Sequence, residues 1–173
     1  MLKFTSCQPI SQFSTPQSAH LLTGIVRGYE RECLRVDEAG QLARTPHPLA
    51  LGSKLTHPWI TTDYAEALLE FITPPSAEPP FALSFLTDVH RFSAQQLDHE
   101  VLWAGSMPCK IGADADIAIA DYGVSHTARF KQAYRQGLSL RYGRAMQTIA
   151  GAHYNWSLPE AFWLSLRDSV GGD

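Results

Sequence analysis

The chain has 173 residues, a hydrophobic content of 45%, four tryptophans and a formal net charge of −3. These totals are those of one globular domain with a core and argue against a disordered chain. The weak negative charge, without a concentration of basic residues, argues against nucleic-acid binding, which needs Lys and Arg to neutralise phosphates. No apolar run approaches the length of a membrane span, and the first residues lack the apolar segment of a secretion signal.

The three cysteines, Cys7, Cys33 and Cys109, are widely spaced and form no C-x-x-C pair. This pattern fits neither a disulfide framework nor a zinc site, and it is typical of a reducing compartment. We therefore expect a cytoplasmic protein without a membrane anchor.

The first predicted elements are a lead-in and a hairpin. Residues 1–18 are rich in Ser, Gln and Pro and predict either a loosely structured lead-in or a short helix docked late. A strand follows over 27–36, RGYERECLRV, then a turn over 37–40 and a return strand over 41–44. Residues 47–56, interrupted by Pro and Gly, read as a loop that could flank a functional site.

Glu30 and Glu32 are the candidate metal ligands of the first strand. Side chains alternate between faces in a strand, so these two share one face while Cys33 points to the other. Two carboxylates at such a short separation repel each other unless a cation lies between them, and Mg²⁺ prefers oxygen ligands. A solvated strand face is the ordinary alternative.

The segment 59–74, WITTDYAEALLEFITP, has a periodicity that fits either a strand or a helix. Under either reading Glu66 and Glu70 share a face, and Glu70 is embedded among apolar residues, where a carboxylate needs a partner. Asp63 is a second acidic candidate. The alternatives are a helix with Asp63 as its N-cap and Glu66 completing a capping box, and a solvent-facing position for Glu70.

An amphipathic packing helix is predicted over 81–100, with Leu83, Leu86, Val89 and Phe92 at helical spacing. His90 and His99 on it are expected to be surface or core residues rather than ligands. The acidic segment 114–123, DADIAIADYG, lacks the ligand spacing of a calcium loop, so a turn or loop is expected.

A second helix is predicted over 125–142, with Ser125 as its N-cap. The residues expected to form its apolar stripe are Phe130, Ala133, Tyr134 and Leu138. It is also the most basic part of the chain, through Arg129, Lys131, Arg135 and Arg141. These cations either form a solvated face or meet an anionic ligand.

The segment 145–159, AMQTIAGAHYNWSLP, reads as a strand with an unusually polar face. The residues on that face are Gln147, Ile149, Gly151, His153 and Asn155. Amides and imidazole donate hydrogen bonds to phosphate and carboxylate oxygens, so this face is a candidate ligand surface. A short amphipathic run follows over 159–167.

Four segments together resemble one enzyme family. They are RGYERECLRV, LGSKLTHPWITTDYAEALLEFITP, SMPC and GRAMQTIAGAHYNWSLPEAFW. In order and spacing they are similar to the N-terminal part of proteobacterial glutamate-cysteine ligase, also called γ-glutamylcysteine synthetase, from about residue 24 to residue 163. The resemblance divides the chain into a variable lead-in, 1–23, and an N-terminal part of a catalytic domain, 24–173.

The resemblance implies an α+β fold similar to glutamine synthetase, with a curved, mainly antiparallel sheet and packing helices. It also implies the first step of glutathione biosynthesis, in which ATP drives ligation of the γ-carboxylate of L-glutamate, through γ-glutamyl phosphate, to the amine of L-cysteine. Mg²⁺ is the implied cofactor and ATP the co-substrate. The implied metal-binding residues are Glu30, Glu32, Asp63 and Glu70. The implied substrate- and nucleotide-binding residues are Tyr64, Tyr134, Gln147, Ile149, His153 and Asn155. Of the whole set, Glu30, Glu70 and His153 are the expected catalytic residues.

Members of this family are considerably longer than this chain. We therefore expect an incomplete fold with apolar surface exposed where further strands belong, a C-terminal part as partner, and little or no turnover by the 173 residues alone. Two alternatives remain at this point: a noncatalytic module that at most binds Mg-ATP, and a related carboxylate-amine ligase that uses another amine.

Overall fold

The computed structural model describes residues 12–171. Within them the chain forms an α+β structure built on one antiparallel sheet with the strand order β2-β3-β1-β4, in which β5 also pairs with β1. The strands are β1 (Val26–Asp37), β2 (Ile60–Thr62), β3 (Leu68–Ile72), β4 (Glu100–Leu102) and β5 (Ala152–Ser157). The α-helices are α2 (Pro79–Gln95), α3 (His126–Tyr142) and α4 (Glu160–Ser169).

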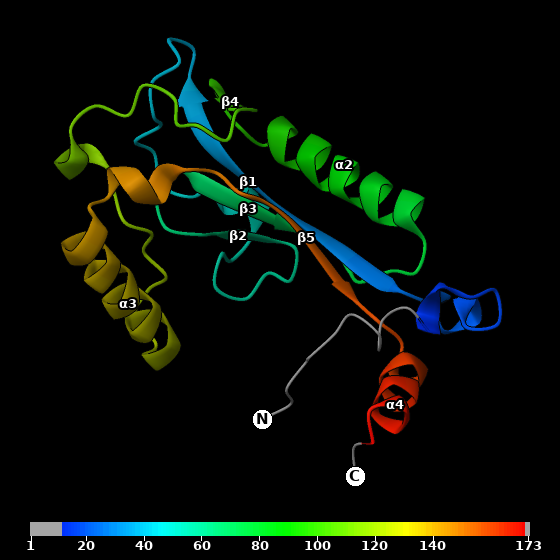
Figure 1. The fold of residues 1–173 in the computed structure, drawn as a ribbon. Coiled ribbons are helices and arrows are strands. Elements are labelled where there is room, and N and C mark those ends of the chain that lie inside the picture. The colour runs from blue at the N-terminus through cyan, green and yellow to red at the C-terminus, as the bar shows by residue number, and fades with distance from the viewer. Residues whose placement is uncertain (1–11, 172–173) are drawn as a thin grey trace.

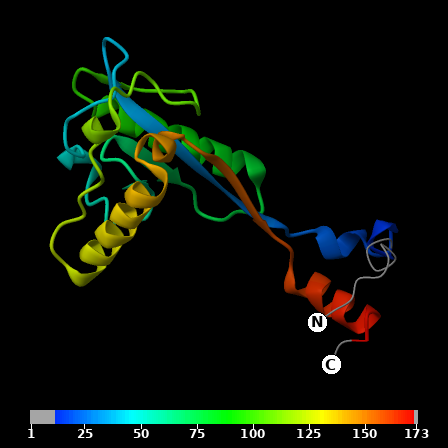
Figure 2. The same ribbon diagram turned by 60° about the vertical axis from the view of Figure 1, so that its left-hand side comes forward.

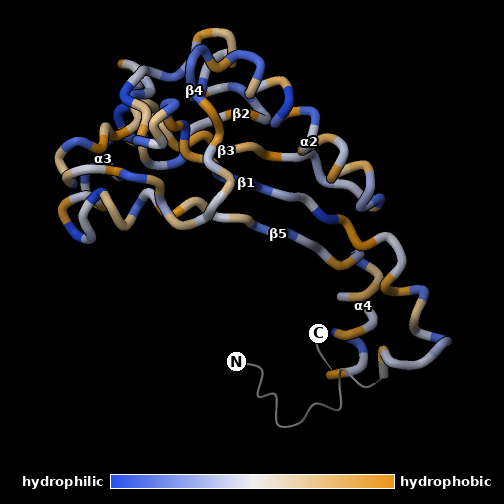
Figure 3. The backbone as a smooth tube through the Cα atoms, turned by 90° about the horizontal axis from the view of Figure 1, so that it is seen from above, coloured by the Kyte–Doolittle hydropathy of each residue, from blue (hydrophilic) through white to orange (hydrophobic). Residues whose placement is uncertain are grey.

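Strand β1 organises the sheet, because its 12 residues pair with three other strands (Figure 1). Strand β3 lies along one side of β1, while β5 and β4 pair with the N-terminal and C-terminal parts of the other side. Seen from above, β3, β1 and β5 run side by side (Figure 3). Residues of β1 therefore lie between two neighbouring strands, where their side chains meet partners from both.

Helix α2 covers one face of this sheet (Figure 1). A buried apolar cluster forms there, and its members are Cys33, Leu51, Ile60, Leu69 and Phe71, with Leu86 and Val89 of α2 packed against it. The His90 ring packs against the Phe71 ring at a tilted angle, with ring centroids 4.4 Å apart. The buried position of Cys33 and the packing role of His90 are confirmed. The predicted helix exists but spans 79–95 rather than 81–100, so His99 lies outside it. Of its expected apolar stripe, Leu86 and Val89 pack on the sheet, whereas Leu83 and Phe92 are 50% and 45% exposed.

A second apolar cluster lies on the opposite face, at one end of the sheet. Its larger members are Leu34, Leu42, Tyr64, Leu68 and Ile117, with Leu138 of α3 and Ala145 of the 3-10 helix η5 (Ala145–Thr148) packed against them. Helices α2 and α3 thus lie on opposite sides of β1 (Figure 2). Only one end of this face is covered by apolar packing, and the rest of the face carries the site.

The described part of the lead-in packs at the far end of β1 and β5. Two 3-10 helices, η1 (Gln12–Ser14) and η2 (Ala19–Leu22), lie beside α4 (Figure 2). Phe13 is buried, and its ring centroid lies 4.4 Å from that of Phe162. The short docked helix is therefore the better of the two predictions for residues 12–18, and residues 1–11 lie outside the described part.

The hairpin is confirmed, although its return strand is short. Val36 forms a single antiparallel bridge with Leu42, and the turn closes through a hydrogen bond from the Gly40 N–H to the Asp37 carbonyl, 2.9 Å. Gly40 has a φ of 71°, a conformation that glycine adopts at little cost. Residues 114–123 form a short 3-10 turn and loop, as expected.

Three further expectations need correction. Residues 59–74 form strands β2 and β3 with a turn between them, so the helix with a capping box at Asp63 is wrong. The strand expected from residue 145 begins only at Ala152, because residues 145–148 form η5. On α3 the expected stripe is wrong except at Leu138, which packs against the core: Phe130 and Tyr134 are 75% and 61% exposed, whereas Arg135 is buried.

Among residues 12–171, no helix is both long enough and apolar enough to cross a membrane.

Candidate functional site

The acidic residues of three strands meet on the sheet face opposite α2. Glu30 and Glu32 project there from β1, Glu70 projects from β3, and Asp63 directly follows β2. Glu32 and Glu70 are register partners across the β1–β3 ladder, and Glu30 is the partner of His153 across the β1–β5 ladder. The two-residue period of the strand thus puts Glu30 and Glu32 on one face, as predicted. We call these four carboxylates the acidic face.

Glu30 is held by two side chains of β5. Nδ2 of Asn155 donates a hydrogen bond to Oε1 of Glu30 at 2.8 Å, and Nδ1 of His153 lies 3.1 Å from Oε2 of Glu30. Against a carboxylate, that ring nitrogen is the protonated one. The polar strand face predicted for His153 and Asn155 therefore exists, and its first role is to fix a carboxylate.

Glu32 is held by the backbone just before β5. The Gly151 N–H donates to Oε2 at 2.6 Å, and the Glu32 N–H donates to the Gly151 carbonyl at 3.0 Å. Glu32 is only 9% exposed. Both its backbone and its carboxylate are thus tied to one glycine, which leaves it little freedom to turn away.

The acidic face carries more negative charge than its surroundings neutralise. Burial, followed by the charges of Asp63, Glu32 and Glu30, raises the pKa of Glu70 to about 7. Burial also raises the pKa of Asp63, although Arg135 opposes this, and it raises the pKa of Glu32 despite the hydrogen bond from Gly151. Crowded carboxylates of this kind attract a cation.

The donor set is one that suits Mg²⁺, which takes oxygen ligands and commonly only one or two carboxylates, with water and phosphate oxygens completing its shell. Within residues 12–171, no group of three or more His, Cys, Asp or Glu side chains is arranged to hold a metal ion by itself. An ion at this face would therefore share its coordination with water or with a bound phosphate.

Arg135 links α3 to the acidic face. Its Nε donates to the backbone carbonyl of Asp63, and its guanidinium carbon lies 4.7 Å from the centroid of the Tyr122 ring. The Tyr122 hydroxyl in turn donates to the backbone carbonyls of Thr62 and Asp63. Arg135 was one of four cations expected on this helix, but nothing in the sequence distinguished it from its neighbours or predicted the part of Tyr122.

The remaining predicted residues lie around the acidic face in different settings. Tyr64 is 1% exposed and packs in the apolar core, whereas Tyr134 is largely exposed on α3. Gln147 lies in η5 rather than in a strand, and Ile149, just after η5, is 41% exposed. Their predicted roles in binding substrate or nucleotide stay predictions.

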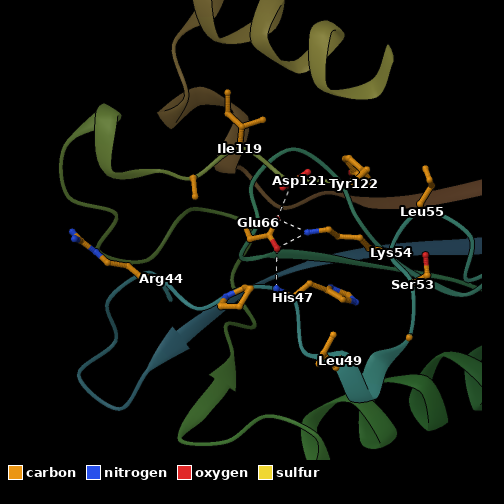
Figure 4. Close-up of a pocket in the computed structure, with 13 residues that line it drawn as sticks. Arg44, His47, Leu49, Ser53, Lys54, Leu55, Glu66, Ile119, Asp121 and Tyr122 are labelled. Atoms are coloured by element: carbon orange, nitrogen blue, oxygen red, sulfur yellow. Dashed lines mark hydrogen bonds and ion pairs between the residues drawn. The ribbon is translucent and has the colours of Figure 1, made fainter. Parts of the chain in front are cut away.

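Glu66 belongs to a different site from Glu70. It lies in the turn before β3 and lines a cavity of about 560 Å³ (Figure 4). Its carboxylate accepts hydrogen bonds from Lys54 Nζ and from the backbone N–H groups of His47 and Asp121, at 2.8 and 2.9 Å for the latter two. Burial opposes ionisation, but these donors outweigh it and lower the Glu66 pKa. Glu66 is thus a neutralised anion and has no need of a metal.

Comparison with known proteins identifies the family. The family model described as glutamate-cysteine ligase matches residues 10–172. The chain belongs to this family. Relatives named glutamate–cysteine ligase include one from Azotobacter vinelandii, 59% identical over 90% of this chain, and one from Alcanivorax borkumensis, 55% identical over 96% of it. The resemblance drawn from the four sequence segments is confirmed.

Solved structures of glutamate-cysteine ligase relatives share the fold. A Francisella tularensis glutamate–cysteine ligase in complex with AMP is 40% identical and covers 86% of this chain, with a TM-score of 0.83. A bifunctional glutathione synthetase from Pasteurella multocida is 31% identical over 93% of this chain, with a TM-score of 0.79. The expected α+β class with a mainly antiparallel sheet is confirmed. The chain spans 29% and 31% of the two curated relatives, and 30% and 20% of the two solved chains.

Proposed function

We propose that the acidic face is the part of an ATP-dependent glutamate-cysteine ligase that receives Mg²⁺ and the nucleotide phosphates. The observation that carries this proposal is the crowding of Glu30, Glu32, Asp63 and Glu70 on one face, which raises the pKa of Glu70 to about 7. Support also comes from the relatives named glutamate–cysteine ligase and from the AMP complex of the Francisella tularensis enzyme.

The proposed reaction needs bound Mg²⁺, and the acidic face would supply carboxylate ligands for it. A carboxylate is a poor acyl electrophile, so ATP first phosphorylates the γ-carboxylate of L-glutamate, and the amine of L-cysteine then displaces phosphate. Bringing ATP next to a substrate carboxylate places like charges together. Bound Mg²⁺ would neutralise this charge and hold the phosphates in line for transfer.

The residues of this chain then act by holding and orienting groups. Glu30 and Glu32 are fixed on β1 by β5 and by Gly151, so their oxygens are preorganised before a ligand arrives. Because Nδ1 of His153 is engaged by Glu30, a hydrogen bond to substrate or phosphate oxygens would come from the Nε2–H of the doubly protonated ring, whose side chain is 53% exposed. Cys33 is 3% exposed on the other face, so a covalent role for it finds no support in the structure.

The test is ADP release by the 173-residue chain with Mg²⁺, ATP and glutamate, with and without cysteine, together with direct measurement of Mg-ATP binding. Glu30→Gln should weaken Mg-ATP binding at least about tenfold, because it removes one anionic ligand and the anchor of His153 and Asn155. Glu38→Gln is the matched control, because it removes the same charge from a side chain that is 80% exposed and outside the acidic face. Equal binding by the wild-type chain and Glu30→Gln would refute the proposal.

A noncatalytic Mg-ATP-binding module is the second candidate. The observation favouring it is that all six residues of β5, which carries His153 and Asn155, are exposed. Mg-ATP binding that depends on Glu30 without ADP release would support this candidate for the isolated chain. Cysteine-dependent ADP release would refute it, and release with another amine instead would indicate a related carboxylate-amine ligase.

A further inference from the structure

We infer that Gly151 is a positioning residue for the acidic face, an inference that rests on the function proposed above. It holds Glu32 through both of its backbone polar groups, and its missing side chain leaves the space through which His153 reaches Glu30. Gly151 lies just before β5, where β5 begins to pair with β1.

The backbone of Gly151 fixes Glu32 from two directions. Its N–H donates to Glu32 Oε2 at 2.6 Å, and its carbonyl accepts the Glu32 N–H at 3.0 Å. The same carbonyl accepts a hydrogen bond from Nη1 of Arg31 at 3.0 Å, while Nη2 of Arg31 donates to the Ala104 carbonyl at 2.6 Å. Arg31 thus holds the glycine in place, and the glycine holds the carboxylate.

The side of Gly151 that a Cβ would occupy is taken by His153. A Cβ there would lie 2.7 Å from Nε2 and 3.1 Å from Cδ2 of His153, and 3.3 Å from Oε2 of Glu32. A contact of 2.7 Å is too close for a carbon and a nitrogen, so the imidazole would have to rotate away. Since Nδ1 of the same ring lies 3.1 Å from Oε2 of Glu30, rotation would break that hydrogen bond.

The backbone itself does not require glycine at this position, because the φ of Gly151 is not positive. The His153 side chain is 53% exposed, so it can swing into solvent without unpacking the core. An added methyl group should therefore leave the fold intact and disturb only the acidic face. This separates a positioning role from a merely structural one.

The first test compares Gly151→Ala with Gly137→Ala, a matched control on α3 where an added Cβ meets nothing within 4 Å. Mn²⁺ is the probe, and the free ion is measured by electron paramagnetic resonance. Gly151→Ala should bind Mn²⁺ about three- to tenfold more weakly, as expected when a partly exposed hydrogen bond to a carboxylate is lost, with a melting temperature close to that of the wild type. Gly137→Ala should bind like the wild type.

The second test repeats the change in a His153→Ala background. If Gly151→Ala acts by displacing the imidazole, its effect on Mn²⁺ affinity should fall below about twofold there, because the two changes remove the same interaction. An unchanged affinity in Gly151→Ala, or an equal loss in both backgrounds, would overturn the inference.

A third measurement needs no metal and separates this inference from the proposed function. The ¹⁵N signals of the His153 ring in the metal-free chain should shift in Gly151→Ala and stay in place in Gly137→Ala. If the wild-type chain binds Mn²⁺ neither alone nor together with ATP, the proposed function fails, and these signals alone decide whether Gly151 positions His153. Unmoved signals in Gly151→Ala would refute the positioning role.

Discussion

Replacing Glu70 with glutamine should stabilise the metal-free chain at pH 8 while weakening its response to magnesium. The variant keeps the shape of the side chain but removes the charge that burial and the neighbouring carboxylates oppose. The Glu70 pKa rises from 4.5 to about 7, and each pH unit corresponds to about 1.4 kcal/mol, so ionisation costs the folded state at most about 3 kcal/mol. Partial solvent exposure reduces this to about 2 kcal/mol.

The sign of the effect follows from proton binding. A carboxyl group with a raised pKa binds its proton more tightly in the folded than in the unfolded state, so its contribution to stability is complete below about pH 4.5 and is lost as the pH rises to about 7. The melting temperatures of Glu70→Gln and the wild type should therefore differ little near pH 4.5. At pH 8 the Glu70→Gln substitution should raise the melting temperature by roughly 4–8 °C.

Thermal unfolding followed by circular dichroism in EDTA, at both pH values and then with excess MgCl₂, measures both effects. Mg²⁺ should raise the melting temperature of the wild-type chain, because it binds the folded state, and should do so much less in Glu70→Gln. The matched control is Glu66→Gln, which should lower the melting temperature at pH 8, since it breaks the largely buried ion pair with Lys54, whose two side chains are each 13% exposed, but should keep the Mg²⁺ response. Destabilisation of Glu70→Gln at pH 8, or a full Mg²⁺ response in that variant, would refute the reasoning.

Three further predictions concern stability. Burial, followed by the charge of Lys54, lowers the pKa of His47 to about 4. The free energy of unfolding should therefore fall by up to about 3 kcal/mol as the pH falls from 6.5 to 4, because the unfolded state protonates first. Urea unfolding at each pH should show that His47→Gln lacks this loss. Arg35→Met should cost about 3–5 kcal/mol in urea unfolding by stranding Glu100, and Arg35→Met with Glu100→Gln should recover most of it. Ser125→Ala should cost about 1 kcal/mol, since its hydroxyl caps α3, and an unchanged urea midpoint would contradict this.

The parts of the site that could be predicted from sequence are those fixed by local geometry. Strand alternation alone places Glu30 and Glu32 on one face and Cys33 on the other, and it holds because β1 is one continuous strand. The same rule relates His153 to Asn155 within β5. Helix α2 is predictable from apolar spacing and α3 from its Ser125 cap, because both are local signals. The apolar stripe expected on α3 is not a reliable signal, since Phe130 and Tyr134 are exposed.

The parts that could not be predicted depend on contacts between distant segments. Glu66 and Glu70 lie four residues apart, yet Lys54 neutralises Glu66 while other carboxylates surround Glu70. Gln147 was placed on a strand because the polar pattern continues through it, but the chain first turns through η5, where the Thr148 hydroxyl donates to the Ala145 carbonyl at 2.7 Å. No periodicity in a single sequence encodes either difference.

The acidic face is unfavourable by itself, and the surrounding fold explains how it persists. Glu32 and Glu70 face each other across β1 and β3, and those two strands are held together by apolar residues on the α2 side and by Leu34 and Leu68 at the end of the acidic side. The strands cannot separate to relieve the repulsion without exposing both clusters to water. Protonation of Glu70, whose pKa is about 7, relieves part of the repulsion, and binding of a cation would relieve it while leaving the carboxylates ionised. Binding of the proposed cation would therefore return free energy that crowding takes from the metal-free fold, and it would couple the stability of this sheet to that ligand.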